Sequence, residues 1–456
     1  MTIREEIGKK ILFFDGGMGT LLQEQGLQAG ELPETWNLKN PEPIIQIHKA
    51  YLAAGADIIL ANTFGANRFK YGGDLEKIVT AGVANAKKAV AESGKKAYVA
   101  LDIGSTGKLL KPMGTLDFEE AVGVFAEIIR VGEKAGADLI LIETMSDTYE
   151  LKAAVLAAKE NSTLPIMATV IFDESKKMLT GASPQVVVSL LEGLGVDALG
   201  INCGLGPKQM KEIVKELLKY ASIPVIVNPN AGLPRSENGK TVFDVGAEEF
   251  AEDMEEIVTM GAWFAGGCCG TTPAHIQAMV EKCKEITPVP ITQKNYTFVT
   301  SYSTAVELGG RPVIIGERIN PTGKSKFKQA LRDHNIDYIL EEGVKQEDSG
   351  AHILDVNVGL PEIDEAAMME TIVYELQSIM PIPLQIDTTN MEAMERALRI
   401  YNGKPMINSV NGKAEIMEQV FPLVKKYGGA VVGLALDEDG IPDTTEGRLA
   451  IAEKIY

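Results

Sequence analysis

The sequence predicts an α/β protein in which a closed (β/α)8 TIM barrel precedes a second, incomplete β/α barrel. Short apolar runs recur along the chain at intervals of about 30–40 residues and do not alternate with polar residues. Such runs are typical of parallel strands that are buried on both faces. The segments between them, such as residues 74–94, carry apolar residues at helical spacing. This alternation, interrupted once near residue 300, indicates two successive barrels.

Eight apolar runs precede the interruption, which is the strand count of a closed (β/α)8 barrel. They occupy residues 11–17, 57–64, 97–104, 138–145, 165–172, 197–204, 223–230 and 262–270. Helices between them end in AGAD at 54–57 and 135–138 and in LGVD at 194–197, where a glycine can cap the helix. A doubly wound open sheet is the alternative, but no G-x-G-x-x-G follows the first run. We assign residues 1–285 to the barrel.

The alternation of strand-like and helix-like segments stops at residues 286–310, where prolines, serines and threonines predict a linker. Five further apolar runs then follow, at residues 312–320, 351–359, 382–390, 404–412 and 430–439. The last helical segment ends at Tyr456. Because a barrel needs eight strands, we expect residues 311–456 to be the N-terminal part of a second barrel that is truncated within this chain.

The composition narrows the class of protein. The chain has 456 residues, is 45% hydrophobic and carries a formal net charge of −19. Such a charge disfavours nucleic acid and anionic membranes as partners. The N-terminal apolar run of residues 11–14 is too short for a signal peptide or a membrane span. Four cysteines are too few for a disulfide scaffold of this size, so we expect a cytoplasmic protein.

Three of the four cysteines fall where barrel strands are predicted to end. Cys203 ends the sixth run, and the adjacent Cys268 and Cys269 end the eighth. Residues after the carboxyl ends of barrel strands converge on one face, so the three thiols can meet there. Three thiolates suit Zn²⁺ and leave one exchangeable position, as catalytic zinc requires. A strained vicinal disulfide and simple burial as small hydrophobes are the alternatives for the pair.

Specific motifs extend this interpretation. The segments FFDGGMGT, IET, GINCG and GGCCG occur in this order and resemble the homocysteine-binding barrel of zinc-dependent homocysteine S-methyltransferases. IGERIN, LDVNVG, QIDTTN and INSVNG resemble the pterin-binding barrel that methyltetrahydrofolate methyltransferases share with dihydropteroate synthases. A homocysteine barrel followed by a folate barrel resembles the N-terminal modules of cobalamin-dependent methionine synthases. The resemblance covers nearly the whole chain.

The resemblance implies a zinc centre with a catalytic role for its ligands. Cys203, Cys268 and Cys269 would bind the metal, and a fourth ligand would leave when the homocysteine thiol arrives. Our candidate for this ligand is the side chain of Asn230, at the end of the seventh run. An ordinary turn residue is the alternative for Asn230.

The resemblance also implies how homocysteine is held. Asp15 and Glu143, which end the first and fourth runs, would bind its amino group, while backbone N–H groups at Gly16 and Gly17 would take its carboxylate. A zwitterion requires such a pairing of carboxylates with exposed amides. Local capping of the turn is the alternative for Asp15. Further residues at strand ends are expected to line the pocket: Asn62, Thr63 and Asp102.

In the second half, Asp387 and Asn408 match the pterin-binding Asp and Asn of the resembled family, with Glu317, Asn320 and Asn357 nearby. A pterin ring presents an amide and amine edge that a carboxylate and amide side chains can satisfy. Hydrogen bonding to loop backbone is the alternative role for Asp387 and Asn408.

The implied reaction makes methionine. A zinc-bound homocysteine thiolate attacks methylcobalamin, which 5-methyltetrahydrofolate remethylates on the second barrel. The cobalamin signature D-x-H-x-x-G is absent from the sequence, so another module or chain must supply that cofactor. Two alternatives remain: a zinc homocysteine methyltransferase that uses another methyl donor directly, and a zinc or redox-sensing barrel without methyl transfer.

Overall fold

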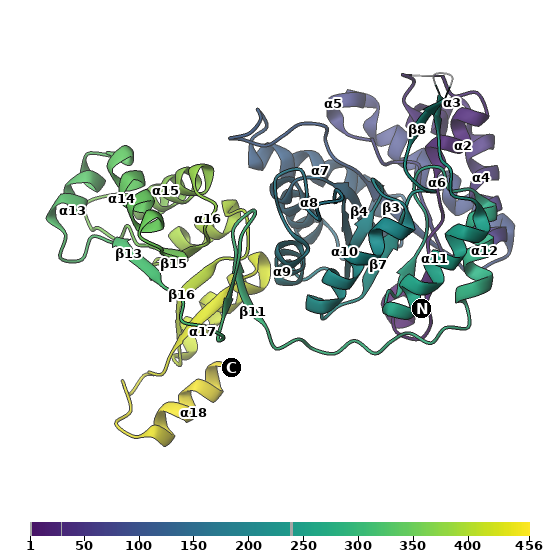
Figure 1. Ribbon diagram of the computed structural model, residues 1–456. Coiled ribbons are helices and arrows are strands. Elements are labelled where there is room, and N and C mark those ends of the chain that lie inside the picture. Colours follow the sequence, from purple (N-terminus) through teal and green to yellow (C-terminus); the bar gives the residue numbers. More distant parts are fainter. Residues whose placement is uncertain (1, 29, 238–239) are drawn as a thin grey trace. The chain divides into compact units, whose positions relative to one another are not determined.

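The computed structural model describes residues 2–28, 30–237 and 240–456. The chain divides into two compact units (Figure 1). The first comprises Met1–Thr180 and Val196–Lys294, and the second comprises Gly181–Gly195 and Asn295–Tyr456. Among the described residues, no helix combines the length and apolar character needed to cross a bilayer.

The first unit is built on an eight-stranded parallel sheet, as the sequence predicts. The order around the sheet is β1-β10-β7-β6-β5-β4-β3-β2. A parallel bridge between Phe14 and Ile58 brings the two end strands together, so the sheet is a nearly closed barrel. The strands are β1 (Leu12–Phe13), β2 (Ile58–Leu60), β3 (Tyr98–Ile103), β4 (Leu139–Met145), β5 (Ile166–Val170), β6 (Ala198–Asn202), β7 (Val225–Asn228) and β10 (Phe264–Ala265).

Helices follow the strands along the chain. The main ones are α4 (Pro41–Ala54), α6 (Leu75–Ser93), α7 (Phe118–Lys134), α8 (Thr148–Asn161), α9 (Pro184–Leu194), α10 (Pro207–Tyr220), α11 (Ala247–Met260) and α12 (Pro273–Cys283). Of these, α9 falls within Gly181–Gly195 and belongs to the second compact unit. The predicted glycine caps are present: Gly55 and Gly195 take φ values of 109° and 76° directly after α4 and α9. These conformations are left-handed, which glycine adopts without steric cost.

Shorter elements complete the first unit. They are α1 (Ile3–Glu6), α2 (Met18–Glu24), η1 (Pro33–Thr35), α3 (Trp36–Lys39), α5 (Arg68–Tyr71), η2 (Gly72–Asp74) and the hairpin of β8 (Arg235–Glu237) with β9 (Lys240–Val242). Helix α1 contributes the buried Ile3 to the barrel core, beside Phe14 and Phe264. Arg4 fixes this helix by two hydrogen bonds to Asp197, at 2.6 and 3.0 Å. One end of the barrel is therefore filled with apolar side chains.

The second unit contains a five-stranded parallel sheet in the order β13-β14-β15-β16-β17, which matches the five predicted runs. Its strands are β13 (Ile315–Ile319), β14 (Ile353–Val356), β15 (Leu384–Asp387), β16 (Met406–Asn411) and β17 (Ala430–Leu434). Its helices are α13 (Ser325–Arg332), α14 (Ile336–Asp348), α15 (Glu365–Ile379), α16 (Met391–Ile400), α17 (Ala414–Tyr427) and α18 (Thr445–Ile455). In the described part of the chain, β13 and β17 are the two edges of this sheet.

The segment that the sequence predicts as a linker is structured in its second half. Residues 297–308 form an antiparallel hairpin of β11 (Thr297–Thr300) and β12 (Ala305–Leu308). Tertiary hydrogen bonds hold it, because Tyr401 donates its hydroxyl to Thr300 O at 2.9 Å and Thr300 N–H donates to Lys404 O at 2.8 Å. The prolines that suggested a linker lie only in residues 286–296, where no helix or strand forms.

Candidate functional site

A cavity of about 340 Å³ opens among the loops that follow the strands of the first unit. These loops lie at the carboxyl ends of the strands, where barrel enzymes carry their active sites. The loops after β1, β2, β6 and β10 contribute to its wall, together with residues near the carboxyl ends of β3 and β4. The lining includes Asp15, Gly16, Gly17, Asn62, Asp102, Glu143, Cys203, Cys268 and Cys269.

The three predicted cysteine ligands meet at this cavity. Their sulfur atoms lie within 4.8 Å of one another, and the Sγ atoms of Cys203 and Cys269 are 3.9 Å apart. Backbone bonds to the β7 loop hold them: Cys203 N–H donates to Asn228 O at 3.1 Å and Cys268 N–H donates to Pro229 O at 2.8 Å. Cys203 has a φ of 58°, a conformation that non-glycine residues rarely adopt and that recurs at functional sites.

The chemistry of this donor set fits zinc. Hydrogen bonds from Cys268 and Cys269 lower the pKa of Cys203, and their bonds to Cys203 raise the pKa values of both. These directions favour ionisation of Cys203 before the other two thiols, and a thiolate attracts a cation. In a tetrahedral site with Zn–S bonds near 2.3 Å, neighbouring sulfurs lie about 3.8 Å apart, close to the 3.9 Å between Cys203 and Cys269.

Asn230, the candidate fourth ligand, lies beside the cysteines and is buried. Its Oδ1 accepts a hydrogen bond from Cys269 N–H at 3.1 Å. A further hydrogen bond from its side chain helps to lower the pKa of Cys203. In this arrangement Asn230 supports the thiols, and its oxygen would have to share or leave the Cys269 amide to reach a metal.

Three buried carboxylates face the same cavity with few partners. Asp15 Oδ2 accepts from Leu60 N–H at 3.0 Å, while Asp15 Oδ1 and Asp102 Oδ1 have no hydrogen-bond partner in the described structure. Burial raises the pKa of Asp15 and of Glu143 to about 8. Burial, and then the negative charges of Glu143 and Asp15, raise the pKa of Asp102 well above its usual range. A cation in the cavity would stabilise the ionised forms.

Two other predicted pocket residues, Asn62 and Thr63, use their side chains to hydrogen-bond backbone carbonyls around the cavity. Asn62 lines the cavity and donates from Nδ2 to Pro33 O at 3.0 Å. Thr63 does not line it, contrary to the prediction, because its hydroxyl turns back to donate to Asp102 O at 2.8 Å. Cys283 is buried in α12, and His275 accompanies Thr272 in the capping box of that helix.

The glycine turn after β1 is clamped to the cysteine loop by a residue that the sequence did not single out. Thr271 Oγ1 accepts from Gly17 N–H at 3.1 Å and donates to Cys268 O at 2.7 Å. A Cβ atom on Gly16 would lie 2.5 Å from Thr271 Oγ1, so this approach requires glycine. Because Gly17 N–H is occupied, the amides left for a ligand at this turn are those at the start of α2, which begins at Met18.

Sequence reasoning also missed two polar residues at the cavity: Asn202, which lies behind its wall, and Glu34, which lines it. Asn202, at the end of β6, contacts both Glu143 and Cys268 through its amide. Glu34 lines the cavity and accepts hydrogen bonds from Gly65 N–H at 2.5 Å and from the Tyr71 hydroxyl at 2.6 Å. The GINCG motif contained a signal for Asn202, but its partners come from other strands.

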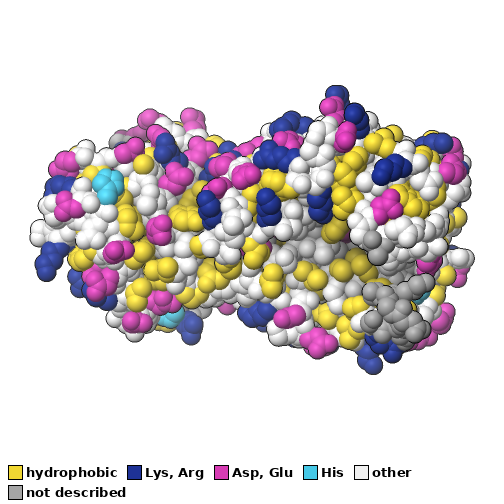
Figure 2. All heavy atoms as spheres, turned by 90° about the horizontal axis from the view of Figure 1, so that it is seen from above, with side chains coloured by type: hydrophobic (Ala, Val, Ile, Leu, Met, Phe, Trp, Pro, Cys, Tyr) yellow, Lys and Arg dark blue, Asp and Glu magenta, His cyan; other side chains and the backbone are white. Residues whose placement is uncertain are grey.

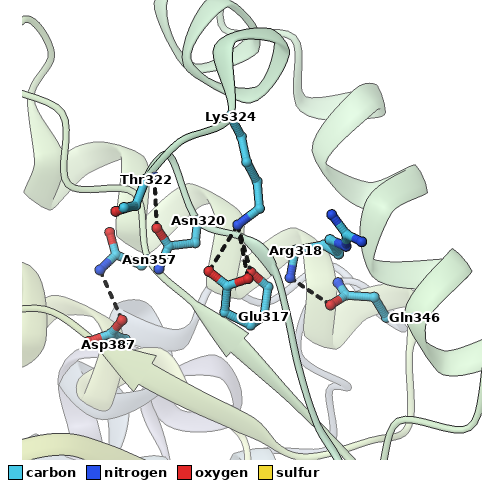
Figure 3. Close-up of polar contacts among 8 residues, drawn as sticks. All are labelled: Glu317, Arg318, Asn320, Thr322, Lys324, Gln346, Asn357 and Asp387. Atoms are coloured by element: carbon cyan, nitrogen blue, oxygen red, sulfur yellow. Dashed lines mark hydrogen bonds and ion pairs between the residues drawn. The ribbon is translucent and has the colours of Figure 1, made fainter.

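The second unit gathers most of its predicted polar residues at the carboxyl ends of its strands (Figure 3). Asn357 Nδ2 donates to Asp387 Oδ2 at 2.9 Å, and Lys324 pairs with both oxygens of Glu317 at 2.9 Å. Asn320 is turned to the backbone, where its Oδ1 accepts from Thr322 N–H at 2.9 Å. Asn408 lies directly opposite Asp387 in the pairing of β15 with β16.

A buried acid was missed beside this cluster. Asp355, at the end of β14, accepts a short hydrogen bond from Gln385 Nε2. Burial is the main reason that the pKa of Asp355 rises to about 6, and it also raises the pKa of Asp387. The two carboxyls favour a ligand that donates hydrogen bonds, since donors stabilise buried carboxylates.

The outer surface adds no rival site of strong charge on the face that Figure 2 presents. Lys and Arg side chains are interspersed there with Asp and Glu side chains, and hydrophobic side chains lie between them. A nucleic-acid partner would call for a clustered basic face instead.

Comparisons with known proteins relate each half of the chain to a known family. Residues 12–283 match the family described as homocysteine S-methyltransferase, and residues 316–453 match the family described as pterin binding enzyme. Methionine synthases of Mycobacterium leprae (strain TN) and Mycobacterium tuberculosis (strain ATCC 25618 / H37Rv) are each 31% identical over 99% and 98% of this chain, respectively. This chain spans 40% of the length of each of these curated relatives.

Solved structures show the same fold. The homocysteine methyltransferase MmuM from Escherichia coli in its metallated form has a TM-score of 0.51 at 23% identity, with 60% of this chain and 96% of that chain covered. Its oxidised form gives a TM-score of 0.50 at 24% identity over the same shares. The family match spans more than half of the chain and includes every strand end that carries the thiols. The chain therefore belongs to the homocysteine S-methyltransferase family and carries a pterin-binding domain in its second half.

Proposed function

We propose that the first unit is a zinc-dependent homocysteine S-methyltransferase site that makes methionine. The observation that carries this proposal is the placement of three converging thiols beside buried carboxylates in one cavity. Thiols alone would suit metal storage or redox sensing. The carboxylates add a place for an ammonium group, which an amino-acid substrate possesses and those other functions do not need.

Cys203, Cys268 and Cys269 would hold the zinc, with Asn230 as the candidate for an exchangeable fourth position. Bound zinc supplies the acidity that keeps a coordinated thiol deprotonated at neutral pH. The residues of the chain then have two tasks. They must orient homocysteine so that its sulfur faces the thiols, and they must leave the opposite side of that sulfur open to a methyl donor.

Asp15 and Glu143 would orient the substrate by its ammonium group. Both carboxyls are buried and under-compensated, so an ammonium returns them to their charged forms. The carboxylate of homocysteine would lie at the turn of Gly16 and Gly17, where the first amides of α2 have no acceptor within the helix. Together these contacts would place the amino acid with its side chain directed at the cysteines.

We propose that the methyl group reaches this cavity from methylcobalamin, and that 5-methyltetrahydrofolate is the ultimate donor. The pterin-binding match of the second unit and the name of the mycobacterial relatives, methionine synthase, support this assignment. Asp387, Asn357 and Asn408, with Glu317 and Asn320, would bind the pterin ring. The cobalamin-binding module would come from outside residues 1–456, consistent with the missing D-x-H-x-x-G signature.

The test measures zinc and methyl transfer on the same preparation. We expect one zinc per chain and homocysteine-dependent demethylation of added methylcobalamin. Cys203→Ala, Cys268→Ala and Cys269→Ala should each lose both. Cys283→Ala, which changes a cysteine buried in α12 outside the cavity, should keep both. Full zinc occupancy with intact transfer in any of the first three variants would refute the site. Zinc and homocysteine binding without demethylation would indicate another methyl donor.

A further inference from the structure

One amide side chain connects the proposed ammonium site to the proposed metal site. Asn202 is fully buried at the end of β6, and it lies behind the cavity wall. Its Nδ2 is 3.3 Å from Glu143 Oε2 and 3.8 Å from Cys268 Sγ. The same nitrogen donates to Thr144 Oγ1 at 2.7 Å. Asn202 therefore contacts one group of each site.

The orientation of this amide is set from the other side. Asn202 Oδ1 accepts from Thr144 N–H at 2.9 Å and from the Thr169 hydroxyl at 2.8 Å. These two donors satisfy both lone pairs of the oxygen. A flipped amide would place its NH2 group against the two donors and leave them unpaired, which is costly for buried groups. The NH2 group must therefore face Thr144 Oγ1, Glu143 and Cys268, which share its two hydrogens.

Thr169 acts only through Asn202. It lies on β5, is fully buried and is not part of the cavity lining. Its hydroxyl thus touches neither a thiol nor the space where a substrate would lie. It can be changed without altering either site directly.

The spacing between Glu143 and Cys268 determines which separation of amino group and sulfur an amino-acid thiol must have to reach both sites. In homocysteine the amino group and the sulfur are separated by one methylene more than in cysteine. A carboxylate that is fixed relative to the metal ligands can therefore measure this separation. A carboxylate that is free to move could also reach the amino group of cysteine, the shorter amino acid, and would not discriminate against it.

We propose that Asn202, oriented by Thr169, is a positioning residue that fixes Glu143 relative to Cys268 and so selects homocysteine over cysteine. This inference rests on the proposed function of the cavity. It assigns the selectivity to a buried hydrogen-bond chain on three neighbouring strands, β4, β5 and β6. The recognised difference is one methylene group, for which a well-formed site gains roughly 10–200-fold.

The experiment compares Thr169→Val with Thr169→Ser in the full chain. Valine keeps the shape of threonine and removes the hydroxyl donor, whereas serine keeps the donor. Zinc content is measured by elemental analysis, and homocysteine and cysteine affinities are measured by calorimetry. We expect Thr169→Val to retain zinc, to bind homocysteine roughly 10-fold more weakly and to lose most of its preference over cysteine. Thr169→Ser should keep the wild-type preference.

Each outcome decides the inference. Wild-type preference for homocysteine in Thr169→Val overturns it, as does an equal loss of preference in Thr169→Ser. If Thr169→Val does not fold, Thr169→Ala, which also removes the hydroxyl donor without touching either site, takes its place with the same expected loss. A wild-type protein that binds neither zinc nor homocysteine would instead refute the proposed function. The two failures are therefore distinguishable.

Discussion

At the scale of single residues, the main feature of the cavity is a group of buried carboxyls that have no basic side chain beside them in the described lining. Asp15, Asp102 and Glu143 are buried, and among the residues that the structure describes no lysine or arginine lines the space that they face. Burial therefore holds their pKa values high when no ligand is bound. A ligand that brings a positive charge would therefore stabilise the carboxylates of this cavity in their ionised forms. The ammonium group of an amino acid would meet this need, and a zinc ion held by the adjacent thiols would bind a sulfur-containing side chain.

Replacing Glu143 by glutamine tests this residue directly. Glu143→Gln should weaken homocysteine binding by roughly one to two decades, since losing one charge-assisted hydrogen bond costs about 1.5–3 kcal/mol. Zinc should remain at the wild-type level, because the carboxylate is not one of the three converging thiols. Calorimetric titration with homocysteine and a parallel zinc analysis provide the measurement. An unchanged homocysteine affinity would remove Glu143 from the substrate site.

At the scale of elements, the sequence predicted all the strands of the two parallel sheets and missed the two hairpins. Buried parallel strands are continuous apolar runs, which are visible without tertiary knowledge. The hairpin of β11 and β12 depends instead on a hydrogen bond that the Tyr401 hydroxyl donates and on one that Lys404 O accepts, and both residues are distant in sequence. The cysteines were predictable because they follow strand ends. Thr271 and Asn202 were not, because their roles arise only from partners on other loops and strands.

The contribution of Tyr401 to stability, through its bonds to the hairpin of β11 and β12 and to the five-stranded sheet, can be measured. The Tyr401 hydroxyl is buried, donates to Thr300 O at 2.9 Å and accepts from Leu384 N–H at 3.0 Å. Tyr401→Phe removes the hydroxyl partner of both backbone groups and should lower the free energy of unfolding by about 1–3 kcal/mol. Urea denaturation measures this change, and Tyr456→Phe at the exposed end of α18 is the matched control. Equal stability of the two variants would show that the hydroxyl does not anchor the hairpin.

At the scale of the whole molecule, the two candidate sites share no residue. The cysteines and the carboxylates of the cavity belong to the first compact unit, whereas Asp387, Asn357 and Glu317 belong to the second. Each unit has its own parallel sheet, and each site lies at the carboxyl ends of strands in that sheet. We therefore expect homocysteine and folate to bind independently, each at the parallel sheet of its own unit.

This separation predicts that the two binding functions can be lost one at a time. Asp387→Asn removes the charge next to Asn357 and should weaken methyltetrahydrofolate binding by roughly one to two decades, because a hydrogen bond to a charged group is lost. Homocysteine affinity and zinc content should stay at wild-type values. Cys268→Ala should do the reverse, abolishing zinc and homocysteine binding while folate binding persists. Calorimetric titration of each variant with each ligand gives the four measurements. A change in one unit that altered binding in the other would show that the sites are coupled within residues 1–456, and the expectation of independent binding would have to be abandoned.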